Sequence, residues 1–141
     1  MSIFRFSYCI CLADTDAAGV VYFSRLLEIC HRAYEAALAA AGIELAAFLA
    51  PAATIALPIS QVEARFLAPL RCGDRLTVEV SAALLEAGRF AVDYCLLVAT
   101  YERPAAIART THTCIDLHQR QRQTLPVNLR KWVVSCARDR S

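Results

Sequence analysis

The stretch LADTDAAGVVYFSRLLEICHRAYEAAL, residues 12–38, joins two carboxylates and a turn of small residues to a long amphipathic pattern. From Ser24 onward, apolar and small residues recur at helical spacing and charged residues fill the other positions. This pattern predicts one long helix with a buried face, closed by Gly42 as a left-handed terminal residue. Glu28 and Arg32 are spaced for an ion pair on its exposed face. The apolar positions are Leu26, Cys30, Ala33, Ala37 and Ala41.

Alternating patterns before and after this helix predict strands. Residues 4–12 are rich in β-formers, and residues 60–66 and 75–84 alternate apolar with polar side chains. In residues 60–66, Val62, Ala64 and Phe66 share one side, which is typical of a strand with one covered face. Turns at residues 86–89 and 102–105 separate the next segments, so the three successive strands predict an antiparallel meander.

Together these elements predict one α+β domain over residues 1–141, in which a curved antiparallel sheet wraps around the long helix. A short helical turn before Pro51 and a short helix in the C-terminal tail complete it. The strands also carry apolar residues on the face away from the helix, such as Leu97 and Ala99. Because exposed apolar surface favours association, we expect a homo-oligomer, either a dimer or a tetramer.

Composition excludes several classes of protein. Hydrophobic residues make up 57% of the chain, and the formal net charge is only +2, which is too mild for a nucleic-acid-binding surface. No apolar run reaches the length of a membrane span, and the N-terminus lacks the pattern of a leader segment. We therefore expect a soluble cytoplasmic protein with no nucleic acid or membrane partner.

The seven cysteines include no C-x-x-C pair, and no cluster of cysteine and histidine has the spacing of metal ligands. We interpret them as buried thiols, with Cys9 and Cys11 facing the same way, in a reducing compartment. His31 is expected to pair with Glu35 along the helix, and His112 and His118 are expected at the surface. The sequence thus predicts no metal and no cofactor.

Two short motifs carry a resemblance to a known family. The run DAAGVVYF, residues 16–23, leads into the long helix, and a Gly73–Asp74 turn follows later. With these motifs nearly the whole chain resembles the hotdog-fold acyl-CoA thioesterases of the 4-hydroxybenzoyl-CoA thioesterase superfamily. DTDAAGVVYF and the ending CIDLHQRQRQTLPVNLR look most like the branch that hydrolyses 1,4-dihydroxy-2-naphthoyl-CoA in phylloquinone and menaquinone biosynthesis. Related branches act on 4-hydroxybenzoyl-CoA or short-chain acyl-CoAs.

The resemblance implies a catalytic role for Asp16, which would attack the thioester carbonyl or activate a water. Backbone N–H groups around Val20 to Phe23, at the positive end of the helix, would polarise the carbonyl oxygen. Gly19 allows the substrate to approach the backbone closely. Tyr22 and Phe23 would line an aromatic acyl pocket, or else pack in the core. The candidates to bind the phosphates of CoA are Arg65, Arg71 and Arg89.

Other interpretations of the same residues remain open at this point. Asp16 has the residue type of an ordinary helix N-cap, and Asp14 is expected to hold backbone groups in the turn. A hydratase or dehydratase on the same fold would need a histidine acting with a carboxylate near the helix, and no histidine precedes the helix. A module that binds acyl-CoA or an acyl carrier without turnover would keep the pocket but not need Asp16.

Overall fold

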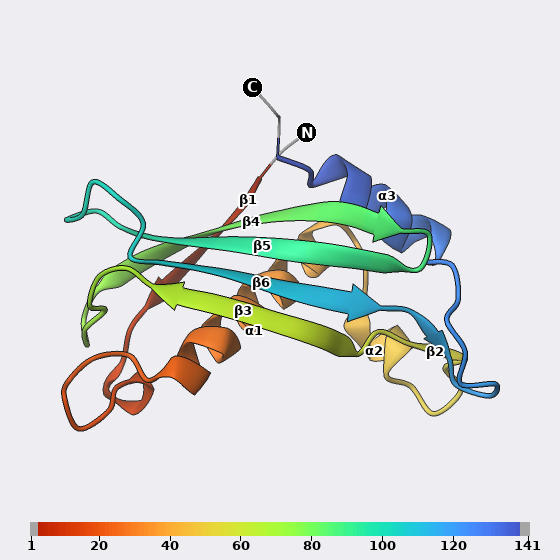
Figure 1. Ribbon diagram of the computed structural model, residues 1–141, viewed down its shortest axis with the longest axis horizontal. Helices are drawn as coiled ribbons and strands as arrows, with labels where there is room; N and C mark the ends of the chain where they lie inside the picture. The colour runs from red at the N-terminus through yellow and green to blue at the C-terminus, as the bar shows by residue number, and fades with distance from the viewer. Residues whose placement is uncertain (1–2, 139–141) are drawn as a thin grey trace.

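A five-stranded antiparallel sheet forms the body of the protein, and its strand order is β1-β4-β5-β6-β3 (Figure 1). The computed structural model describes residues 3–138. Consecutive strands β4, β5 and β6 are neighbours, which confirms the predicted meander. The first strand pairs with β4 and the strand after the helix pairs with β6, so they form the two edges. The strands are β1 (Phe4–Cys9), β3 (Ile59–Phe66), β4 (Arg75–Glu86), β5 (Arg89–Val98) and β6 (Ala106–Thr113).

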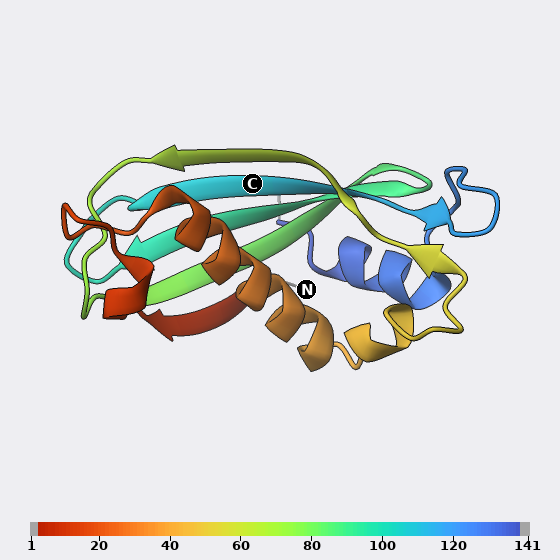
Figure 2. The ribbon, with the colours of Figure 1, turned by 90° about the horizontal axis from the view of Figure 1, so that it is seen from below.

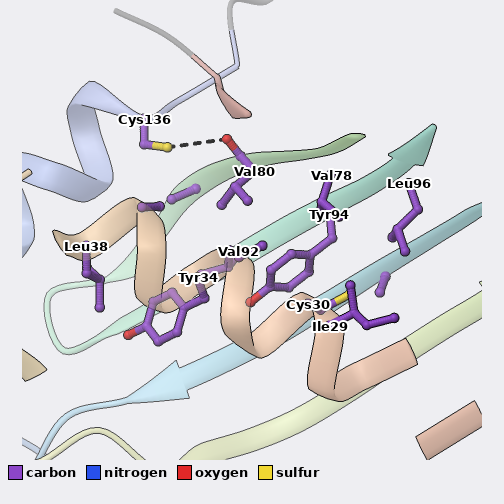
Figure 3. Close-up of a cluster of buried hydrophobic side chains, with 14 of the residues drawn as sticks. Ile29, Cys30, Tyr34, Leu38, Val78, Val80, Val92, Tyr94, Leu96 and Cys136 are labelled. Carbon is purple, nitrogen blue, oxygen red and sulfur yellow. Dashed lines mark hydrogen bonds between the residues drawn. The ribbon is translucent and has the colours of Figure 1, made fainter. Parts of the chain in front are cut away.

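The long helix α1 (Phe23–Ala40) lies across one face of this sheet, as Figure 2 shows from below. Its buried side chains meet alternate residues of β4 and β5, because successive residues of a strand point to opposite faces. Figure 3 shows Cys30 and Tyr34 of α1 beside Val92 and Tyr94 of β5. Gly42 has a φ of 78° just after the helix, as its position predicted. The predicted hotdog architecture, a curved sheet around one long helix, is confirmed.

Smaller elements close the end of the sheet that lies away from the N-terminus of α1. The short helix α2 (Leu45–Phe48) and the C-terminal helix α3 (Val127–Ser135) lie on the same side of the sheet as α1 (Figure 2). Helix α3 packs its buried face, including Trp132, against β4. Strands β2 (Ile55–Ala56) and β7 (Ile115–Asp116) form a separate two-stranded sheet. This pair is too short for sequence periodicity to reveal.

Two predictions about exposed side chains are wrong. All eight residues of β3 are exposed, including Val62 and Phe66, because α1 covers the central strands and does not reach this edge. The apolar pattern of β3 therefore marks a face that this chain alone leaves uncovered. On α1, Glu28 pairs with Arg25 at 2.8 Å, and not with Arg32.

The cysteines are not uniformly buried. Cys30, Cys114 and Cys136 are buried, and burial raises the pKa of the Cys30 thiol to about 12. Cys9 and Cys11, which we had expected to be buried, are exposed because they lie at the end of edge strand β1 and beyond it. All seven cysteines are free thiols. Cys72, in the turn before β4, is also exposed, and Cys95 is partly buried, so the prediction of buried thiols holds only for the three core positions.

His112 is buried, contrary to its predicted surface position. It lies on β6 with 1% of its surface exposed, and its ring stacks on Phe90 at a centroid distance of 4.9 Å. Its Nε2 forms a hydrogen bond of 2.8 Å with the Thr110 hydroxyl, and Tyr34 of α1 packs on its other side. Burial, and then the neighbouring His31, lowers the pKa of His112 to about 4. His31 itself stacks on Tyr34.

We expect the free energy of unfolding to decrease between pH 6.5 and pH 4 because of His112. The unfolded chain binds a proton near pH 6.5, whereas the folded chain binds one only near pH 4. The contribution of neutral His112 to stability is therefore fully present above pH 6.5. About 2 kcal/mol of unfolding free energy should be lost by pH 5. Urea unfolding at pH 7.5 and pH 5 measures this loss. In His112→Gln the loss should shrink by that amount, and an equal loss in the variant would contradict the assignment.

Candidate active site

The residues predicted for catalysis and for the acyl pocket lie on a hairpin between β1 and α1 and at the start of that helix. Its two legs run antiparallel, since the Tyr22 N–H donates to the Asp14 carbonyl at 2.9 Å and the Asp16 N–H donates to the Val20 carbonyl at 2.9 Å. Gly19 occupies the tip with a φ of 81°, a conformation that favours glycine. A hairpin of this kind places Asp16 on one leg and the start of α1 on the other.

The Asp16 carboxylate holds its own turn with one oxygen and leaves the other oxygen free. Oδ1 accepts the Ala18 N–H at 2.8 Å and the Val20 N–H at 3.4 Å. Among the described residues, nothing donates a hydrogen bond to Oδ2. The interpretation of Asp16 as the N-cap of α1 is wrong, because the N-cap position is Tyr22 and no side chain caps it. The exposed Oδ2 is therefore available to react.

The start of α1 offers two unoccupied backbone donors. The N–H groups of Val21 and Tyr22, within the predicted set, are already bonded to the carbonyls of Leu70 and Asp14. Phe23 and Ser24 are the first two helical residues, so their N–H groups have no intrahelical acceptor. No acceptor for either is found within residues 3–138. With the positive end of the helix dipole, they can stabilise an oxyanion.

Asp14 anchors the base of the hairpin and is 5% exposed. Its Oδ2 accepts the Tyr8 hydroxyl at 2.8 Å, the Cys11 N–H at 3.0 Å and the Cys11 thiol at 3.2 Å. Burial alone would raise the pKa of Asp14, but these donors lower it below its ordinary value. The expectation that Asp14 holds backbone groups is confirmed.

An open apolar cavity of about 420 Å³ adjoins the second leg of the hairpin. It lies between that leg and the segment that follows β3, which are joined by the Val21 N–H bond to Leu70 and by the bridge between Val20 and Arg71. Its volume falls in the range of small-ligand sites. The lining residues are Val20, Val21, Phe66, Leu67, Ala68, Pro69 and Leu70.

The predicted aromatic residues lie beside this cavity and do not line it. Tyr22 and Phe23 pack against each other at a centroid distance of 4.7 Å, and 46% and 60% of their surfaces are exposed. The interpretation that these two side chains pack in the core of this chain is therefore wrong.

The three candidate CoA-binding arginines lie in different places. Arg71 adjoins the hairpin through its bridge to Val20. Arg65 lies on β3 among the charged residues of the outer sheet face, which is turned away from α1. Arg89 begins β5 and pairs with Glu86 at 3.5 Å. It lies about seven residues, or roughly 23 Å of strand, from Leu96, which is paired through Ala106 with the cavity residue Phe66. Of the three, Arg71 is best placed for a ligand at the hairpin.

Sequence reasoning missed three parts of this site. Ser24 was assigned only to the helix, although its N–H completes a donor pair with Phe23. The segment from Phe66 to Leu70 was not connected with the hairpin, because contacts across such a sequence distance leave no local pattern. Tyr8 was interpreted only as a strand residue, although its position next to the last residue of β1 places its hydroxyl on Asp14.

Within residues 3–138 no group of three or more potential metal ligands comes together. In the same range, no helix is long and apolar enough to cross a membrane. The free carboxylate oxygen, the paired amides and the apolar cavity are thus the chemical features of the hairpin region.

Comparisons with known proteins agree on one family. Residues 11–133 match the model of the thioesterase-like superfamily. A relative from Synechococcus elongatus, named 1,4-dihydroxy-2-naphthoyl-CoA hydrolase, is 47% identical over 133 residues, which cover 94% of this chain and 96% of the relative. A protein of the same name from Thermosynechococcus vestitus is 46% identical, and the match covers 92% of this chain and 87% of that relative.

A solved structure resembles the whole fold. It is a 1,4-dihydroxy-2-naphthoyl-CoA thioesterase from Synechocystis, with a TM-score of 0.88 and 36% sequence identity. The match covers 94% of this chain and 96% of that one.

Proposed function

This chain belongs to the thioesterase-like superfamily, and on that premise we propose that it hydrolyses the aromatic thioester 1,4-dihydroxy-2-naphthoyl-CoA to 1,4-dihydroxy-2-naphthoate and CoA. One observation carries the activity: the free Oδ2 of Asp16 and the free N–H groups of Phe23 and Ser24 belong to one hairpin. The names and the high coverage of the relatives support the substrate.

The reaction needs a nucleophile and a site for the developing oxyanion. The thioester carbonyl oxygen would accept hydrogen bonds from the N–H groups of Phe23 and Ser24, which the helix fixes in place before the substrate arrives. The carboxylate of Asp16 then acts by one of two routes. In the first it attacks the carbonyl carbon, expels CoA thiolate and forms an anhydride that water hydrolyses. In the second it takes a proton from the attacking water.

The acyl group would occupy the cavity beside Val20, and the pantetheine arm would leave toward solvent near Arg71. The apolar lining suits an aromatic ring system. We expect the enzyme to act in the cytoplasm, since seven free thiols fit a reducing compartment.

Aromatic acyl-CoA esters should be hydrolysed with a higher kcat/KM than long aliphatic ones. The apolar cavity of about 420 Å³ is in the size range of a fused aromatic ring, whereas an extended sixteen-carbon chain would run beyond it. The test is thiol release from a panel comprising 1,4-dihydroxy-2-naphthoyl-CoA, 4-hydroxybenzoyl-CoA, acetyl-CoA and palmitoyl-CoA. The first should be the best substrate. If palmitoyl-CoA were preferred, the substrate assignment would be wrong.

The assembly that performs this reaction is proposed to be a homodimer or a dimer of dimers. Strand β3 is an edge strand, its face toward α1 is apolar and exposed, and it leads directly into the lining of the cavity. Unprotected apolar edges of this kind favour pairing with another strand. A second copy on β3 would also cover Phe66 and the aromatic pair of the hairpin, which are exposed in the single chain.

Sedimentation at micromolar concentration should give at least twice the chain mass of 15.5 kDa. Val62→Glu on β3 should shift the protein toward the monomer, because it places a charge in the apolar edge. Val134→Glu, at a more exposed valine of α3, serves as the control and should leave the mass unchanged. An active wild-type monomer would contradict the proposal.

The two alternative functions receive less support. A hydratase would need a histidine at the site, but His112 is buried about six residues along β6 from Ala106, or roughly 20 Å from the end that adjoins the cavity. A binding module would not need a free carboxylate oxygen beside two free amides. Thiol release distinguishes it, since such a module would bind acyl-CoA without turnover.

A further inference from the structure

The contacts of Asp14 connect strand β1 with both functional legs of the hairpin. Its carboxylate is tied to β1 and the residues just after it, through the Tyr8 hydroxyl at 2.8 Å and the Cys11 N–H at 3.0 Å. Its own carbonyl oxygen accepts the Tyr22 N–H at 2.9 Å. One nearly buried residue therefore holds the base of the hairpin to the sheet and to the start of α1.

Asp14 lies close to both reacting groups along the two legs of the hairpin. Asp16 lies two residues beyond Asp14 on the first leg, and Phe23 directly follows Tyr22 on the second. Between them, Thr15 and Val21 form an antiparallel bridge. The spacing between the Asp16 carboxylate and the Phe23 N–H is consequently set by how firmly Asp14 fixes the base of the two legs.

At neutral pH the protonation states of Tyr8 and Asp14 keep the hydrogen bond between them intact. Three donors on one oxygen keep the pKa of Asp14 below its ordinary value. Burial, followed by the bond to Asp14, raises the pKa of Tyr8. Tyr8 thus remains a hydroxyl donor and Asp14 remains an ionised acceptor, and a hydrogen bond to a charged group is stronger than one between neutral groups.

We propose that Asp14, clamped by Tyr8, is a positioning residue that aligns the Asp16 carboxylate with the oxyanion donors of α1. This proposal rests on the proposed function and adds to it a residue that touches neither substrate nor reacting atoms. Misplacement of a reacting group by about an ångström can cost up to about a hundredfold in rate. Loss of the anchor should therefore lower kcat much more than it changes KM, because neither Asp14 nor Tyr8 lines the acyl cavity.

The experiment compares Tyr8→Phe and Asp14→Asn with Tyr94→Phe. Tyr94 is a matched control, because it is also a strand tyrosine whose hydroxyl forms a hydrogen bond with a side chain, that of Thr110 at 3.1 Å, but in the core away from the hairpin. With 1,4-dihydroxy-2-naphthoyl-CoA as substrate, Asp14→Asn should lower kcat about ten- to a hundredfold, and Tyr8→Phe somewhat less. KM should stay within about twofold, and Tyr94→Phe should keep its kcat. Thermal melting confirms that each variant is folded at the assay temperature.

Amide hydrogen exchange gives a second readout that does not depend on turnover. The Tyr22 N–H should exchange faster in Asp14→Asn than in the wild type, whereas amides in the middle of β5 should be unaffected. If Asp14→Asn and Tyr8→Phe lost no more kcat than Tyr94→Phe, or if Tyr22 stayed equally protected, the positioning role would be overturned. The proposed function would still stand in that case if Asp16→Asn were inactive, so the two failures are distinguishable.

Discussion

Asp16→Asn is expected to lower kcat at least about a hundredfold, which corresponds to roughly 2.7 kcal/mol of activation free energy. Asparagine keeps the shape of the side chain, and its carbonyl oxygen can still accept the Ala18 N–H that closes the turn. Its amide nitrogen, however, replaces the free Oδ2 and can neither form an anhydride nor take a proton from water. Steady-state thiol release measures the loss, and thermal melting should show an unchanged midpoint.

Asp116→Asn is the matched control for this substitution. Asp116 also closes a turn, since its Oδ1 accepts the N–H groups of His118 and Gln119 at 2.7 and 2.9 Å, but it ends β7 at the other end of the molecule. It should keep the wild-type kcat. An Asp16→Asn protein that melts normally and turns over at the wild-type rate would remove Asp16 from the mechanism.

Phe90→Ala should produce the largest loss of stability, about 3–5 kcal/mol of unfolding free energy. Phe90 is fully buried on β5, where it stacks on His112 and meets Trp132 of α3 edge-on at 6.2 Å. Its removal leaves a cavity where three elements meet, and the fixed backbone of β5 cannot collapse into it. Urea unfolding at one fixed protein concentration measures the loss, because association also contributes to stability.

The control is Leu49→Ala, at a residue that is 80% exposed. It should change the unfolding free energy by no more than about 0.5 kcal/mol. A similar small change in Phe90→Ala would mean that the aromatic cluster around His112 is not a principal part of the core.

Local patterns were sufficient to predict the long helix, the main strands and their order along the chain. Helical spacing from Ser24 and alternation in β4 identify the long helix and a central strand, because a buried face repeats with the period of its own backbone. The run from Asp16 to Phe23 likewise indicated a turn of small residues before the helix and the carboxylate that opens it. Turn residues fixed the meander, since short connections leave antiparallel neighbours no other arrangement.

Tertiary contacts decided what local patterns could not express. Gly88 looked like an ordinary turn residue, yet a Cβ there would lie 2.3 Å from the Gln123 carbonyl oxygen, in a segment distant in sequence. His112 looked like a surface residue, and its burial follows from packing between Tyr34 of α1 and Phe90 of β5. The face of β3 looked covered because its pattern is apolar, although the helix does not reach it.

The same division applies to the site. The sequence by itself determined that Asp16 precedes a helix start, because both belong to one continuous segment. Three other features depend on residues that approach from other parts of the chain. Leu70 accepts the Val21 N–H and so decides which amides remain free, Arg71 is the arginine that adjoins the hairpin, and Tyr8 holds Asp14. Hydrogen bonds between distant segments form only when the sheet brings those segments together, so the tertiary structure alone assigns them.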